Sequence, residues 1–437
     1  METMVLLAFA ATLTVCMVLG LPLLLALVLG YCIFFGYGLY QKHTISDILR
    51  MSLTSIRTAK NILILFFMIG LLTALWRAGG TIPAIVYYSA GLVRPSIMVL
   101  MAFLLNCLVS FLTGTAFGTA ATMGVICMTM ATSMNINPVI AGGAILSGVY
   151  FGDRCSPVST SALLVAELTK TDIFQNIRLM VKTALVPFLA TCAVYLVLGM
   201  SSAQGASAAG DIQALFAANF RLGWVPLIPA AIILILALFK VKVKLAMLCS
   251  ILSALAVTIG FQGMAVPQVL EAMVFGYRAS TPELAAMVDG GGLVSMLRVA
   301  AIVCLSSSYA GIFAGTGLLE PLKVKVEGLS RRTSPFGSML AVSAVAGMIA
   351  CNQTLTIMLT HQICAAAERD NQQTAIDLEN TAVVVAPLIP WSIAGGVPLS
   401  SVAAPMTGIL AACYLYLVPL WNLLVQQTAR RKAGKED

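Results

Sequence analysis

The stretch GAILSGVYFGDRCSPVS covers residues 143–159. It contains the end of a long apolar run that begins at Val139, followed by the charged pair Asp153 and Arg154. Residues 158–168 then resume an apolar helical pattern, so the charged pair lies between two hydrophobic segments. An ionisable residue at membrane depth is energetically costly and is functional by default. The stretch therefore predicts a membrane helix that is interrupted at a polar, functional point.

The composition of the whole chain is that of a membrane protein. Of its 437 residues, 60% are hydrophobic and 10% are charged, whereas soluble domains carry about 25% charged residues. Apolar stretches of roughly 20 residues, the length that spans a bilayer, recur throughout. We therefore predict an all-α, polytopic fold with about ten to twelve membrane segments in one transmembrane domain, residues 1–437. The basic residues behind the net charge of +8 are scattered at span ends, so we expect a lipid bilayer and no nucleic acid as partner.

The expected spans follow from the apolar runs and from the Gly and Pro residues that end them. An amphipathic link is expected over 169–182 and a mostly amphipathic segment over 266–290. The basic turn at 240–244 and the charged C-terminal tail are expected in the cytoplasm, because cytoplasmic loops are rich in Lys and Arg. The spans lie at about 4–20, 21–40, 61–78, 82–92, 95–112, 183–200, 224–239 and 245–261, before a second membrane block that reaches about 426.

The second membrane block resembles the first at a spacing of about 240 residues. This predicts two structural repeats, at about 55–200 and 291–426, joined by a linker and connecting spans at about 201–290. The alternative is a chance alignment of two hydrophobic blocks, because Gly and Pro are common in membrane helices. The matched features are Gly70 with Gly311, Pro95 with Pro335, 113–119 with 351–356, and 152–157 with 389–396.

Four polar interruptions are expected within the apolar blocks: 113–119, 152–157, 351–356 and 390–398. Unwound backbone in lipid leaves unpaired polar groups, so such breaks persist where protein or a water-filled cavity satisfies them. Transporters commonly place their ion and substrate sites at breaks of this kind. The alternative is that the small polar residues only permit close helix packing. The candidate ligands, all with hard oxygen atoms, are Thr113, Thr115, Thr119, Ser156, Asn352, Gln353, Thr354 and Ser392.

Asp153 is the strongest candidate for an ion site. Burial disfavours the charged form of a carboxyl group, so a carboxyl group in the membrane can exchange a proton for a cation near neutral pH. The alternative is a structural ion pair with Arg154. Arg154 itself has three possible roles: it holds Asp153 ionised, binds a substrate carboxylate through two hydrogen bonds, or extends to the membrane surface.

Other charged residues gather in the polar segment AAAERDNQQTAIDLEN, where solvated side chains are expected. No metalloprotease or phosphate-binding motif occurs, and the chain holds two His residues, so we expect neither an enzyme nor a resident cofactor. The charged residues of that segment are Glu368, Arg369, Asp370, Asp377 and Glu379.

The stretch at 143–159 resembles the NhaC family of sodium/proton antiporters, and the resemblance extends over nearly the whole chain. The run TGTAFGTAATMG at 113–124, the pair Asn352-Gln353 and the run LIPW at 388–391 are also similar to that family. The matching residues of the first stretch are Gly143, Ala144, Ser147, Gly148, Phe151, Gly152, Asp153, Ser156, Pro157 and Ser159.

The resemblance implies two inverted repeats with re-entrant hairpins, often in a homodimer, in the inner (plasma) membrane. It also implies sodium and protons as transported ions, and we assign Asp153 and Asn352 as sodium ligands, with Ser159 and Thr160 at the same site. One departure is that Thr160 stands where the family has a second aspartate. This leaves three readings open: sodium/proton antiport, cation-coupled transport or exchange of a small organic acid or amino acid, and a passive channel.

Overall fold

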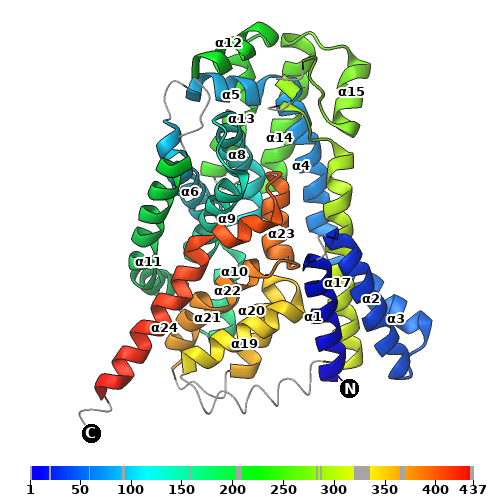
Figure 1. The fold of residues 1–437 in the computed structure, drawn as a ribbon, viewed down its shortest axis with the longest axis vertical. Helices are drawn as coiled ribbons and strands as arrows, with labels where there is room; N and C mark the ends of the chain where they lie inside the picture. Colours follow the sequence, from blue (N-terminus) through cyan, green and yellow to red (C-terminus); the bar gives the residue numbers. More distant parts are fainter. Residues whose placement is uncertain are drawn as a thin grey trace.

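Helices build the fold in the computed structural model, and the part of the chain that it describes contains no strand longer than an isolated bridge. At one end of the molecule lie α5 (Thr81–Ala90), α12 (Ala209–Asn219) and α15 (Val266–Phe275), while both termini lie at the other end (Figure 1). The described residues are 2–18, 21–58, 60–90, 94–157, 159–202, 209–239, 241–281, 284–285, 288–318, 335–364 and 370–433.

The N-terminal helices confirm the spans expected before residue 113 to within a few residues. Gly80 has a positive φ of 76° and separates α4 from α5, which are bent by 62° relative to one another. Pro95 opens the next helix, where its missing N–H needs no partner. These helices are α1 (Glu2–Val18), α2 (Leu23–Tyr40), α3 (Ile45–Thr58), α4 (Lys60–Ala78), α5 (Thr81–Ala90) and α6 (Pro95–Thr113).

The rest of the first membrane block is interrupted after Thr113 and after Cys155, as expected from its polar runs. Most of the amphipathic link expected over 169–182 is helical and continuous with the span expected at about 183–200, because one helix runs from Ile173 to Ser202. That helix continues through Pro187, which membrane helices tolerate. The elements are α7 (Ala116–Thr119), the π-helical turn η1 (Ala120–Gly124), α8 (Val125–Ser133), α9 (Pro138–Cys155), α10 (Thr160–Thr169) and α11 (Ile173–Ser202).

The connecting region confirms the two spans expected near 224–239 and 245–261. The segment expected to be mostly amphipathic over 266–290 begins as the helix α15, which ends at Phe275, where Gly276 adopts a φ of 96°. Tyr277 and Gly290 form an isolated bridge across that segment. The elements are α12 (Ala209–Asn219), η3 (Val225–Leu227), α13 (Ile228–Leu238), α14 (Val243–Ala256), the π-helical turn η4 (Val257–Phe261) and α15 (Val266–Phe275).

The second membrane block repeats the pattern of interrupted helices. Its breaks lie after Ala350 and after Leu388, and the helices on either side of the latter are bent by 59°. The elements are α17 (Leu293–Thr316), α19 (Pro335–Ala350), α20 (Gln353–Cys364), α21 (Asn371–Asn380), α22 (Ala382–Val385), η5 (Ala386–Leu388), α23 (Ile393–Ser401), η6 (Met406–Ala411) and α24 (Cys413–Ala433).

The described helices bear out a polytopic membrane protein. Five of them are long and apolar enough to cross a membrane, or seven when each of the two bent pairs counts as one span. Further apolar helices have 10–17 residues, which is the length expected where a span is interrupted. The five long spans are Pro95–Thr113, Ala116–Ser133, Ile173–Ser201, Lys244–Phe261 and Leu293–Thr316.

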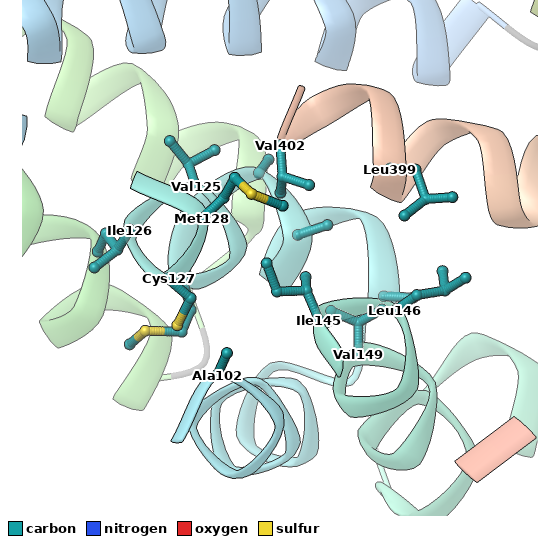
Figure 2. Packing of buried hydrophobic residues seen from close by; sticks show 14 of the residues in the cluster. Ala102, Val125, Ile126, Cys127, Met128, Ile145, Leu146, Val149, Leu399 and Val402 are labelled. Atoms are coloured by element: carbon teal, nitrogen blue, oxygen red, sulfur yellow. The ribbon is translucent and has the colours of Figure 1, made fainter. Parts of the chain in front are cut away.

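The main apolar core joins the two blocks. Side chains of α6, α8 and α9 meet Leu399 and Val402 from the end of α23 (Figure 2). Gly152 lets α9 lie against α6, since an added Cβ would come within 2.3 Å of Ser110 and of the Phe111 amide nitrogen. Small residues that allow backbones to approach closely are the usual basis of helix packing in membranes.

We expect Gly152→Ala to destabilise the protein by about 1–3 kcal/mol, because the new methyl group forces α9 away from α6. Thermal unfolding of the detergent-purified protein measures this. Gly36→Ala in α2 is the control, since a Cβ there meets no atom within 4 Å. Equal melting temperatures for the two variants would show that the close approach of α6 and α9 is not needed.

Candidate functional site

Each of the four breaks is followed by a helix whose first turn is capped by a polar side chain. The capping oxygens accept backbone N–H groups that the start of a helix leaves unpaired. Capping therefore accounts for one role of these residues, and a ligand role for them remains a prediction. The side-chain oxygen of Thr115 accepts from the backbone N–H of Gly118, and that of Ser159 accepts from those of Ser161 and Ala162. In the second block, Asn352 accepts from the backbone N–H of Leu355, and Ser392 from that of Ala394.

The breaks after α6 and α19 share a backbone feature. Gly114 and Cys351 both adopt the left-handed conformation, with φ of 66° and 56°. The amide nitrogen of Ile393 donates to the carbonyl oxygen of Cys351 at 2.8 Å, which ties the break after α19 to the start of α23. Matching turns in the two blocks fit the predicted pair of repeats, and their inverted relation stays a prediction.

Asp153 joins the first block to the second. Its side chain is 4% exposed and accepts three hydrogen bonds. Ser159 Oγ donates to Oδ1 at 3.0 Å, while Ser161 Oγ and Gln353 Nε2 donate to Oδ2 at 2.9 and 3.1 Å. The carboxyl group is therefore held between the starts of α10 and α20, which are far apart in the sequence (Figure 1).

A cavity of about 570 Å³ reaches Asp153. Four of the residues predicted from the sequence line it: Asp153, Thr115, Thr160 and Gln353. The side chain of Thr160 is exposed there, so the position of the family's second aspartate faces the cavity. The wall is completed by Leu65, Ala116, Phe117, Gly118, Lys242, Lys244 and Leu245.

Arg154 points away from the cavity and is fully buried. The ion pair with Asp153, expected as one alternative, is not formed, and the side chain does not extend to the membrane surface. Its guanidinium instead binds α11, α21 and α24, because the buried acceptors of those helices need donors. The acceptors are the carbonyl oxygens of Glu379 and Met180, each at 3.2 Å, Thr183 Oγ1 at 3.0 Å, Tyr414 Oη at 3.4 Å, Cys155 Sγ at 3.4 Å, and Asn380 Oδ1.

The other predicted residues lie within the breaks rather than on the cavity wall. Thr113 and Thr119 share a hydrogen bond of 3.0 Å between their hydroxyl groups. Ser156 and Ser392 are buried, and Thr354 is exposed on the first turn of α20.

Ser161 was missed as a site residue. It donates to both the carboxylate and the carbonyl oxygen of Asp153, at 2.9 and 3.1 Å. Its place in the first turn of α10, two residues after the cap Ser159, is a signal that the sequence did contain.

The solvated state expected for the charged residues near 370–380 was wrong for two of them. Asp377 is 1% exposed and Glu379 is fully buried, because the segment forms the packed helix α21. Asp377 accepts hydrogen bonds from Gln373 and Gln426 at 2.8 and 2.9 Å. Asp370 is exposed as expected, and residues 365–369 lie outside the described part of the chain.

Comparison with known proteins identifies the family. Residues 148–418 match the model of the Na+/H+ antiporter family. The chain is 26% identical to the Na(+)/H(+) antiporter NhaC of Alkalihalophilus pseudofirmus over 89% of this chain and 86% of that protein. It is 26% identical to the malate-2H(+)/Na(+)-lactate antiporter of Bacillus subtilis, over 92% and 87%. It is 27% identical to the arginine/ornithine antiporter ArcD of Halobacterium salinarum, over 79% and 74%.

The match covers more than half of the chain and includes Asp153, both hydroxyl donors to it and Gln353. The apolar helices and the bent helix pairs agree with a protein that crosses the membrane several times. Together with the buried carboxyl group at the junction of the two blocks, these findings place the chain in the Na+/H+ antiporter family of secondary transporters.

Proposed function

We propose that the protein exchanges sodium ions for protons across the plasma membrane, with Asp153 as the shared site. The observation that supports this is a carboxyl group that is buried, hydrogen-bonded by both blocks and open to a cavity. A sodium ion at Asp153 requires the ionised carboxylate, and a proton there removes that charge. The two ions therefore compete, and a site for which they compete and which faces the two sides of the membrane in turn exchanges one for the other.

The surrounding side chains suit this exchange. Ser159, Ser161 and Gln353 each donate to the carboxylate, which stabilises its charged form when no cation is bound. On arrival of sodium, the hydroxyl groups of Ser159 and Ser161 can rotate and offer oxygen lone pairs, because a hydroxyl both donates and accepts. Asn352, one residue from Gln353, is the second sodium ligand in this proposal.

The residues that line the cavity indicate the side of the membrane toward which it opens in our proposal. Lys242 and Lys244 line it, and they belong to the turn expected in the cytoplasm from its basic residues. Lys240 of the same turn lies outside the described residues. The described conformation is thus open toward the cytoplasm in our proposal.

Flux measurements in proteoliposomes test the proposal. An outward sodium gradient is expected to drive proton uptake into the vesicles, and a proton gradient to drive sodium transport in return. A passive channel would conduct sodium without moving protons. Sodium flux that never moves protons, or no sodium flux at all, would contradict the proposal.

A second substrate class is favoured by the size and charge of the cavity. Its volume of about 570 Å³ exceeds the need of a sodium ion, and two lysines line it, as suits a substrate carboxylate. Relatives named for the exchange of malate and lactate and of arginine and ornithine are 26% and 27% identical to this chain. The same vesicles, loaded with labelled malate, lactate or arginine, should show counterflow if the cavity holds an organic substrate.

A further inference from the structure

Glu379 is a buried carboxyl group to which the exchange at Asp153 assigns no role. It lies on α21, is fully buried, and neither carboxylate oxygen has a hydrogen-bond partner among the described residues. Asp377, on the same helix, is also buried but accepts hydrogen bonds from two glutamine side chains. Of the two carboxyl groups on α21, Glu379 is thus the one without a hydrogen bond.

Arg154 contacts the main chain of Glu379, yet none of its hydrogen bonds reaches the carboxyl group. Its Nε donates to the main-chain oxygen of Glu379 at 3.2 Å, and its other donors reach α11, α24 and Asn380. An ionised carboxylate in a dry interior costs many kcal/mol unless it is paired and hydrogen-bonded. Burial without a hydrogen-bond partner therefore disfavours the ionised form of Glu379 in the described conformation.

Glu379 is connected to the ion site through Arg154. Arg154 directly follows Asp153 on α9, and its Nε donates to the carbonyl oxygen of Glu379 at 3.2 Å. The helices packed against α21 add other titratable groups. Glu167 on α10 and Arg178 and Lys182 on α11 are exposed, while Tyr195 on α11, Cys364 on α20 and Tyr414 on α24 are buried. Cys192 on α11, His361 on α20, and Cys413 and Tyr416 on α24 are half-buried, and α24 ends in Arg430, Arg431 and Lys432.

We infer that Glu379 is a second proton-binding site whose proton is released when sodium occupies Asp153. While Asp153 is ionised, its negative charge disfavours a second negative charge at Glu379. Sodium cancels that charge, so Glu379 can ionise and turn to the guanidinium of Arg154. The O–H bond of its carboxyl group breaks and the proton leaves to water. This inference rests on the proposed exchange of sodium for protons at Asp153.

Glu379 also provides a second carboxyl group near a cavity that has one. Among the described residues, Asp153 is the one carboxyl group that lines the cavity. Thr160 stands on the same wall, where the resemblance to the family implies a second aspartate. With Glu379 behind it, the protein gains a second titratable carboxyl group that the transported cation does not touch.

The test measures proton release when sodium is added to the purified protein in weakly buffered detergent solution. We expect Glu379→Gln to bind sodium and to release about one proton fewer per sodium ion than the wild-type protein. Asp377→Asn is the matched control, and its proton release should equal that of the wild-type protein. Unchanged release from Glu379→Gln overturns the inference but leaves the proposed function standing.

Two further results separate the remaining cases. No sodium-dependent proton release from the wild-type protein at any pH at which sodium binds, including pH values low enough to protonate Asp153, would contradict the proposed function itself. If Glu379→Gln does not fold, infrared difference spectra of the wild-type protein replace it. They should show the C=O band of a protonated carboxyl group that disappears with sodium and shifts in Glu379→Asp. A spectrum with no such band, or one that does not shift in Glu379→Asp, overturns the inference.

Discussion

Asp153→Asn is expected to fold, reach the membrane and lose coupled exchange. Asparagine keeps the size and both polar atoms of the side chain but can neither ionise nor carry a proton. Removing the charged partner of a buried ion costs about 3–5 kcal/mol, which corresponds to roughly a 100-fold or greater loss of affinity. Sodium binding by calorimetry and sodium-driven proton flux in vesicles measure the loss.

The pH dependence gives the same prediction a second readout. Protonation of Asp153 removes the charge that holds sodium, so sodium affinity should fall as the pH falls. With one proton competing for one site, the fall approaches about tenfold per pH unit on the acidic side. Asp153→Asn should show weak sodium binding that does not vary with pH in this way.

Asp172→Asn provides the control, because Asp172 is exposed and caps Gln175, a role that asparagine also fills. It should transport like the wild-type protein. A stable Asp153→Asn protein that still couples sodium to protons would exclude Asp153 as the shared site and direct attention to Asn352 and Gln353.

Arg154→Met is expected to prevent accumulation of folded protein. The change removes the donor for several buried acceptors at once, among them the carbonyl oxygens of Glu379 and Met180. Each buried acceptor left without a partner costs about 1–3 kcal/mol, and the whole folded state is stable by about 5–15 kcal/mol. Yield, size-exclusion profile and melting temperature measure the result.

Arg178→Met on the exposed side of α11 is the matched control and should behave like the wild-type protein. Arg154→Lys keeps the charge but reaches fewer acceptors, so its melting temperature should be lower than that of the wild-type protein. A stable Arg154→Met protein that has lost only transport would instead make Arg154 a substrate ligand, as one alternative from the sequence had it.

The sequence by itself determined the membrane class, most helix boundaries and the place of the main carboxyl group. Apolar length and Gly or Pro residues are local signals, so they located α2, α4 and α6 to within a few residues. The polar run at 152–157 likewise indicated an interruption, and Asp153 lies at its junction with the second block.

The tertiary structure decided which polar residues meet. Whether a charged side chain is solvated depends on the helices packed around it, and the polar composition of 365–380 concealed the packed helix α21. Glu379 was therefore expected in solvent and is buried. The neighbours Asp153 and Arg154 likewise take different surroundings, because adjacent side chains of a helix point about 100° apart. Asp153 turns to the cavity and Gln353, while Arg154 turns to α21 and α24, and this separation follows from helix packing over distances that local sequence patterns do not encode.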